Sequence, residues 1–213
     1  MNPLAGSNAV IAPGPLRVFA NPRSVFVIML LALLLSLPSL RIGLLSDTHG
    51  WLDPRIQEHF KDCDEIWHAG DIGNLQVTDE LTKWKPLRAV WGNVDDATAR
   101  RTFPEHQRFT LGGVRVWMTH IGGRPPRYDR HVIEELRRDP PDLFICGHSH
   151  ILVVQFDPKL NCLYMNPGAA GNHGWHKVRT LLRFTLEDGK PKDLEVIELG
   201  KRGSGPALPD DNH

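Results

Sequence analysis

Short apolar runs, separated by glycine, proline and aspartate, dominate the chain from residue 41 onward. The first five lie at residues 41–46, 65–69, 87–91, 114–119 and 143–146. Their length and their β-branched residues are typical of buried strands. Segments with helical patterns, at residues 54–60, 74–84 and 129–138, alternate with these runs. Alternating strands and helices predict an α/β fold.

The later part of the chain has a different pattern. Residues 151–156, 161–165, 180–186 and 194–199 alternate or run apolar, and turns such as Asp188-Gly189 join them. Gly112-Gly113 also favours a hairpin between residues 109–111 and 114–117. We therefore expect a second, largely antiparallel sheet that packs on the first.

The composition is that of a folded chain with balanced charge. Its 213 residues suit one domain with attachments, and we place that domain at residues 41–200. Because 25 basic side chains balance 25 acidic ones, no global field would hold a polyanion, and a broad nucleic-acid surface is not expected. The three cysteines are odd in number and far apart, which argues against a disulfide framework and favours a reducing compartment.

The two ends of the chain differ from this domain. Residues 1–40 include an unbroken apolar run at 25–35, which is short for a membrane span of about 20 residues. Three interpretations fit it: a start codon assigned upstream of a cytoplasmic protein, an uncleaved membrane anchor, or a signal peptide. We favour the first, and so a cytoplasmic protein without a membrane partner, because the run matches no targeting class cleanly. Residues 201–213 predict a solvated tail.

Side chains that commonly bind metals follow each of the five early strands. They are Asp47 and His49, then Asp71, then Asn93, then His120, and finally His148 and His150. Ligands of open α/β sheets bind beyond the carboxyl ends of the strands, so we expect these side chains at one edge. The mixture of carboxylate, imidazole and amide groups suits Mn, Fe, Zn or Ni rather than Ca or Mg alone. The set exceeds the needs of one ion and suits two ions that share a carboxylate.

These residues occur in a recognisable order. Asp47-Thr48-His49, Gly70-Asp71, Gly92-Asn93, His120 and Gly147-His148-Ser149-His150 resemble the motif set of the calcineurin-like metallophosphoesterases, and the resemblance covers residues 41–200. The short chain and the Asn166-Pro167-Gly168 turn make it similar to the small YfcE-type phosphodiesterases. The resemblance implies an α/β fold that is a four-layer αββα sandwich, with two mixed β-sheets flanked by helices.

The resemblance also implies a role for each residue. Asp47, His49, Asp71 and His150 would hold one divalent ion, and Asp71, Asn93, His120 and His148 would hold the other, so that Asp71 bridges the two. Manganese is the ion expected to work best in vitro. Asp71, Asn93 and His148 are the predicted catalytic residues. Asn93 and Arg124 are predicted to contact the substrate, since a guanidinium group binds anions well.

The expected reaction is metal-assisted hydrolysis of a phosphodiester, in a small molecule or nucleotide, by a metal-bound hydroxide. Many family members carry a histidine directly after the Gly-Asn pair, where it is thought to protonate the leaving group, but this chain has Val94. The YfcE-type branch commonly lacks that histidine, so Val94 favours a phosphodiesterase over a phosphomonoesterase or protein phosphatase. A non-catalytic scaffold, like the retromer-type subunit that resembles this family, is a third hypothesis. A homo-oligomer is compatible with all three.

Other histidines have plainer interpretations. His68 lies within a predicted strand, where we expect it to make hydrogen bonds that support the site rather than to bind an ion. His173 and His176 flank Trp175 in a glycine-rich segment, which indicates a mobile, solvated loop more than a substrate contact.

Overall fold

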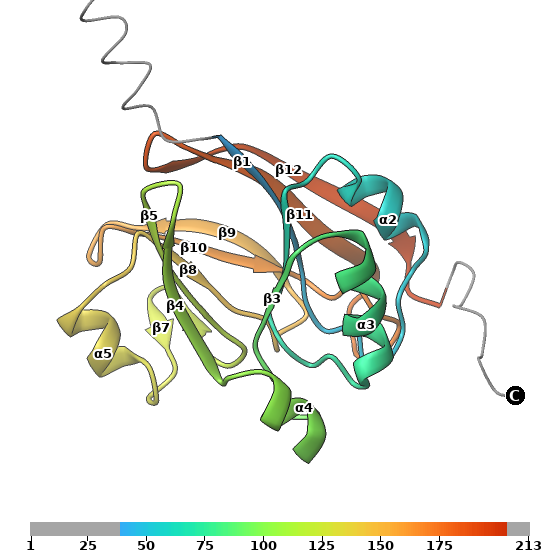
Figure 1. Cartoon of the computed structure of the whole chain (residues 1–213). Coiled ribbons are helices and arrows are strands. Elements are labelled where there is room, and N and C mark those ends of the chain that lie inside the picture. Colours follow the sequence, from blue (N-terminus) through green and yellow to red (C-terminus); the bar gives the residue numbers. More distant parts are fainter. Residues whose placement is uncertain (1–38, 204–213) are drawn as a thin grey trace, which may run out of the picture. The chain divides into compact units, whose positions relative to one another are not determined.

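The computed structural model describes residues 39–203 (Figure 1). The apolar run of the predicted N-terminal extension and residues 204–213 of the predicted tail lie outside that range. Between residues 39 and 203, no helix has the length and apolar character that a membrane crossing requires. Cys63, Cys146 and Cys162 are buried and free, as their spacing predicted.

The first of two five-stranded sheets has the strand order β12-β11-β1-β2-β3. Strands β1 (Leu40–Leu45), β2 (Glu65–His68) and β3 (Leu87–Ala89) run parallel to one another. Strand β11 (Val178–Glu187) pairs antiparallel with β1, and β12 (Lys190–Lys201) pairs antiparallel with β11. Helices α2 (Arg55–Phe60) and α3 (Leu75–Trp84) lie in the crossovers that connect the parallel strands.

The second sheet has the strand order β4-β5-β8-β10-β9. Its central strands β5 (Val114–Thr119), β8 (Leu143–Ile145) and β10 (Cys162–Pro167) run parallel. The edge strands β4 (His106–Leu111) and β9 (Leu152–Asp157) pair antiparallel with β5 and β10. Between β5 and β8 lie helix α5 (Ile133–Arg138) and a small hairpin of β6 (Gly123–Arg124) and β7 (Arg127–Tyr128).

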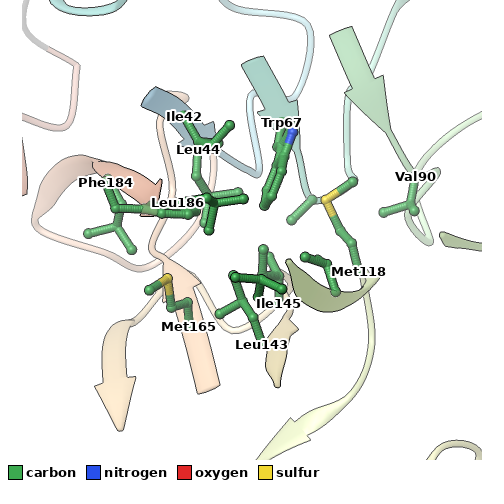
Figure 2. Close-up of a cluster of buried hydrophobic side chains, with 14 residues drawn as sticks. Ile42, Leu44, Trp67, Val90, Met118, Leu143, Ile145, Met165, Phe184 and Leu186 are labelled. Atoms are coloured by element: carbon green, nitrogen blue, oxygen red, sulfur yellow. The ribbon is translucent and has the colours of Figure 1, made fainter. Parts of the chain in front are cut away.

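Three clusters of buried side chains hold four layers together: the pair α2 and α3, the first sheet, the second sheet, and α5 (Figure 1). The central cluster lies between the sheets, where Ile42, Leu44 and Trp67 face Met118, Leu143 and Ile145 (Figure 2). The outer clusters join α2 and α3 to the first sheet, and α5 to the second. This architecture confirms the αββα sandwich of two mixed sheets.

Capping interactions explain where the helices begin. The Asn74 side chain accepts a hydrogen bond from the Val77 N–H at the start of α3. Helix α4 (Ala97–Thr102) was not predicted because it lacks apolar periodicity; it depends on the carboxylate of Asp96, which accepts from two backbone N–H groups of its first turn. Helix α5 begins at Ile133 rather than at residue 129, because the Asp129 side chain caps a preceding turn.

The sheets divide the strands differently from the sequence prediction. Strands β5 and β8 were expected beside the early parallel strands but lie in the second sheet, whereas β11 and β12 return to the first. The second sheet is therefore mixed rather than largely antiparallel. An apolar pattern identifies a buried strand. It carries no information on which of two stacked sheets the strand joins, because both bury it equally well.

Candidate metal centre

The predicted metal ligands lie in loops that follow strands of both sheets. Asp47 and His49 follow β1, Asp71 follows β2 and Asn93 follows β3 in the first sheet, while His120 follows β5 and His148 and His150 follow β8 in the second. Sequence reasoning placed all of them at the edge of one sheet. They lie instead where the carboxyl-terminal loops of two packed sheets meet.

Six of these side chains form two groups that share one carboxylate. The first group contains Asp47, His49, Asp71 and His150, and the second contains Asp71, His120 and His148. Within each group, the atoms that could bind an ion all lie within 4.8 Å of one another. The place of Asp71 in both groups is the geometry that a bridging carboxylate requires.

Short distances join the loops of the two sheets. His150 Nε2 lies 3.2 Å from Asp47 Oδ1 and 3.2 Å from His49 Nε2. His49 Nε2 is 3.7 Å from Asp71 Oδ2. The backbone N–H of His148 donates to the Asp47 carboxylate at 3.2 Å, which ties the loop after β8 to the loop after β1.

Five of the predicted ligands have a left-handed backbone. Asp47, His49, Asp71, His148 and His150 have φ angles between 49° and 66°. Residues other than glycine adopt such angles rarely, and strain of this kind persists where the surrounding structure imposes it, often at functional sites. The loops are therefore shaped to direct these side chains rather than to relax the backbone.

Two glycines allow the loops to come this close. A Cβ at Gly92 would lie 2.2 Å from Asp71 Oδ1. A Cβ at Gly147 would lie 2.1 Å from Ser46 Oγ and 3.0 Å from Asp47 Oδ2. Any other residue at either position would displace a ligand carboxylate, so these glycines are required by close approach.

His120 presents a nitrogen that lacks a partner. Its Nδ1 lies 2.8 Å from the carbonyl oxygen of Ala69, which can only accept, so Nδ1 carries the proton. Its Nε2 is buried and makes no hydrogen bond among the described residues, although Asp71 Oδ1 lies 3.2 Å away. A histidine whose Nδ1–H is held by a carbonyl and whose Nε2 is unsatisfied is arranged to bind a metal.

A similar arrangement fixes the proton on His150. His176 Nε2 lies 3.0 Å from the carbonyl oxygen of Gly171 and must donate to it, which leaves His176 Nδ1 as an acceptor. That Nδ1 lies 3.3 Å from Nδ1 of His150, which therefore donates. The Nε2 of His150 is then free of its proton and faces Asp47 Oδ1.

The loop at residues 171–177 exposes Trp175 to solvent, as the sequence indicated, but its two histidines also lie against candidate ligands. His176 contacts His150, and the His173 ring lies 4.8 Å from the His49 ring, measured between centroids. Sequence reasoning missed this support, and its one signal was the pair of histidines around Trp175. Because His150 lies 26 residues before His176 and His49 lies much earlier in the chain, no local pattern could connect them.

Buried groups hold the ligand loops from behind. The Asp95 carboxylate accepts from the N–H groups of Gly92, Ile72 and Gly73, and so joins the loop of Asp71 to the loop of Asn93. His68 lies 2.9 Å from the Thr48 hydroxyl and accepts from the Gly70 N–H. His68 thus makes the supporting hydrogen bonds predicted for it.

The surroundings favour a protonated imidazole at His120, beside the carboxylates, and neutral imidazoles at His49 and His148. Burial by itself would lower the pKa of His120, but the nearby Asp71 and Asp47 carboxylates outweigh it and raise that pKa. Burial lowers the pKa of both His49 and His148, which favours the neutral form that binds metals. The raised pKa of His120 shows that positive charge is favoured beside these carboxylates, and the oxygen and nitrogen donors present suit divalent cations, so the residues fit such ions.

The remaining predicted site residues lie outside the two ligand groups. Asn93 is exposed and lines a small cavity of about 30 Å³ together with His120 and Ile121. Val94 is 47% exposed, and its backbone N–H donates to Asp71 Oδ1 at 3.0 Å. Arg124 is exposed on β6 and makes no ion pair within residues 39–203.

Comparison with known proteins agrees with this centre. Residues 40–189 match the calcineurin-like phosphoesterase superfamily domain. The chain belongs to this superfamily. A "probable metallophosphoesterase" of Methanothermobacter thermautotrophicus is 28% identical over 172 residues, which cover 75% of this chain and 92% of that protein. A protein of the same description from Methanocaldococcus jannaschii is 27% identical over 163 residues, covering 74% of this chain and 81% of that protein.

Solved structures share the fold at lower identity. An archaeal phosphodiesterase is 22% identical with a TM-score of 0.58, covering 75% of this chain and 99% of that one. Vps29 of Entamoeba histolytica, solved in complex with zinc, is 17% identical with a TM-score of 0.56, covering 74% of this chain and 98% of that one. Likeness at this level establishes the common architecture.

Proposed function

We propose that this superfamily member is a phosphodiesterase that acts with two divalent cations. One observation carries the proposal: two groups of ligands share the Asp71 carboxylate. Asp47, His49, Asp71 and His150 would hold one cation. Asp71, His120 and His148, with the neighbouring Asn93, would hold the other. Manganese, iron, zinc and nickel all suit these oxygen and nitrogen donors.

Divalent cations at such a site neutralise charge on phosphate oxygens and make water more acidic. The chain's own residues position the reactants. The carbonyl groups of Ala69 and Gly171 hold protons on His120 Nδ1 and, through His176, on His150 Nδ1, so both Nε2 atoms point lone pairs at the centre. The Asn93 amide, beside the cavity next to His120, would donate to a phosphate oxygen. Arg124 would contact the anionic part of the substrate.

Val94 supports a preference for diesters. At the position where the family resemblance would place a proton-donating histidine in many members, this chain has an aliphatic side chain. Monoesters with poor leaving groups gain most from such a donor, because general-acid catalysis contributes about 10²–10⁴-fold in rate. The archaeal phosphodiesterase with the same fold supports the same choice.

The fold also supports a second candidate, an interaction scaffold. Vps29 shares the architecture, and its name refers to vacuolar protein sorting. Because Vps29 was itself solved in complex with zinc, a bound ion alone does not separate the two candidates; two ligand groups that share one carboxylate favour catalysis.

Hydrolysis of bis-p-nitrophenyl phosphate and p-nitrophenyl phosphate with manganese tests the proposal. We expect the diester to be cleaved faster, and Asp71→Asn to abolish cleavage. Asp79→Asn, an exposed aspartate of α3, is the matched control and should leave the rate unchanged. Faster cleavage of the monoester would reject the diester preference, and bound metal without turnover would favour the scaffold.

A further inference from the structure

Exposed apolar residues are neighbours in sequence of polar residues that belong to the candidate centre. Val94 follows Asn93, Ile121 follows His120, Ile151 follows His150, and Trp175 lies between His173 and His176; these four are among the exposed large apolar residues of the described chain. We call them the apolar rim. Single exposed apolar residues are ordinary on protein surfaces. Four of them, each one residue away from a polar side chain of the same centre, indicate a substrate with an apolar part.

Trp175 is the extreme member of the apolar rim. Its side chain is 99% exposed, whereas Val94, Ile121 and Ile151 are 47%, 36% and 56% exposed. Tryptophan gains more than any of these from losing contact with water, because its ring is the largest. A fully hydrated indole therefore offers two open faces to a ligand.

The loop that carries Trp175 is docked on the centre by its backbone. A Cβ at Gly174 would lie 2.1 Å from His150 Nδ1, and one at Gly171 would lie 2.2 Å from the carbonyl oxygen of Thr48. The Gly171 N–H also donates to the carbonyl of Asp47 at 3.1 Å. The backbone of residues 171–174 thus touches two of the loops that carry ligands.

Side-chain and terminal contacts hold the same loop. His173 and His176 lie against His49 and His150 on either side of Trp175. In addition, the N–H of Gly203 donates to the Asn172 side chain and the N–H of Arg202 donates to the carbonyl of Lys177. The exposed indole is therefore attached to an anchored loop beside the ligands and not to a free one.

From this arrangement we propose that Trp175 stacks on a planar aromatic ring carried by one arm of the phosphodiester. Every nucleobase has a π-face, so any of them can stack on an exposed tryptophan ring. A nucleobase is also the planar ring that biological phosphodiesters commonly carry. The inference rests on the proposed function, because it specifies the substrate of the same centre. It makes Trp175 a specificity residue that binds the ring and takes no part in bond cleavage.

Binding of two phosphate monoesters to the metal-loaded full chain tests this inference. Adenosine 5′-monophosphate carries a base, whereas ribose 5-phosphate presents the same phosphate and sugar without it. We expect Trp175→Ala to weaken adenosine 5′-monophosphate binding ~10-fold and to leave ribose 5-phosphate binding unchanged. Trp175→Phe keeps a ring and should retain most of the affinity. Phe156→Ala, which removes an exposed aromatic ring on β9, should change neither affinity.

Two results would overturn the inference. In one, adenosine 5′-monophosphate binds no tighter than ribose 5-phosphate. In the other, Trp175→Ala weakens both ligands equally or neither, which would assign the indole to the shape of the centre or to a membrane or protein contact. The hydrolysis assay is read separately. Failure to cleave the diester, with base-dependent binding through Trp175 intact, would reject the phosphodiesterase and support the aromatic subsite.

Discussion

The surroundings of two buried histidines, His68 and His120, shift their pKa values in opposite directions. His68 is fully buried, and burial lowers its pKa to about 4. His120 is almost as deeply buried, yet carboxylates raise its pKa. The difference arises from neighbours: His68 contacts a hydroxyl and a backbone N–H, whereas His120 faces Asp71.

His68 predicts a loss of stability in acid. Its folded-state pKa lies below the ordinary value of 6.5. Between pH 6.5 and about 4, His68 is therefore protonated in the unfolded chain but neutral in the folded chain. Acidification from neutral pH to roughly pH 5 therefore lowers the free energy of unfolding by about 2 kcal/mol. Urea unfolding of metal-free wild type and His68→Gln at several pH values measures this. The variant should be less stable at neutral pH but lose less on acidification, and parallel losses would contradict the prediction.

Val94 predicts a gain of activity by substitution. Its backbone N–H donates to Asp71, and its half-exposed side chain adjoins Asn93, so Val94→His would place an imidazole beside the substrate without changing the backbone contact. We expect faster hydrolysis of substrates with poor leaving groups, by up to ~100-fold, and little change for bis-p-nitrophenyl phosphate. Steady-state rates across a series of leaving groups measure the effect. If the rate of a folded Val94→His variant depended on the leaving group as steeply as that of the wild type, general-acid catalysis would not be the missing component.

Among the elements, the loops carry the site and the strands set their spacing. The loop after β3 is joined to the loop after β2 through Asp95, and the loop at residues 171–177 is joined to the loops after β1 and β8. Each ligand loop is therefore held by another loop in addition to its own strand. A substitution in a supporting loop should therefore change the positions of the candidate ligands and weaken metal binding.

His176 is the residue through which we test this dependence. His176→Ala removes the acceptor that fixes the proton of His150, and loss of such supporting hydrogen bonds typically costs about 10–100-fold in metal affinity. Equilibrium dialysis or competition with a chelator measures the manganese affinity of each protein. His131→Ala removes an exposed histidine elsewhere and should bind manganese normally. Equal manganese affinity of the two variants would show that the hydrogen bond from His150 to His176 does not support metal binding.

The molecule as a whole divides its site between two sheets. Asp47, His49 and Asp71 come from the first sheet, and His120 and His148 from the second. The central cluster between the sheets keeps these two sets in register (Figure 2). Packing far from the centre therefore supports metal binding as well as stability.

Trp67 connects the two sheets and predicts a coupled loss. Its buried ring packs edge-on against Phe109 of the second sheet and Phe184 of the first. Trp67→Ala should destabilise the fold by about 3–5 kcal/mol and lower the retention of metal. Phe156→Ala, at a half-exposed position, should cost roughly 0.5 kcal/mol or less. Urea unfolding and metal content after dialysis give the two measurements, and full metal retention by Trp67→Ala would refute the coupling.

The sequence by itself determined most of the strands and named six candidate ligands that the structure brings together. Apolar runs can be recognised locally, because a buried strand needs a few consecutive residues of the right type. These candidates could be named because each of five motifs joins a side chain of a type that commonly binds metals to the end of such a run. Their strict order along the chain made the family resemblance specific, and it led to the αββα sandwich that the structure confirms.

Only the tertiary structure decided which strands share a sheet and which residues stand behind the ligands. β5 and β8 joined the second sheet, and His176 came to lie beside His150, although nothing in their local sequence requires either outcome. Both depend on contacts between segments far apart in the chain. Such contacts are selected by the packing of the whole molecule, because local patterns specify what a segment can bury but not the partner against which it is buried.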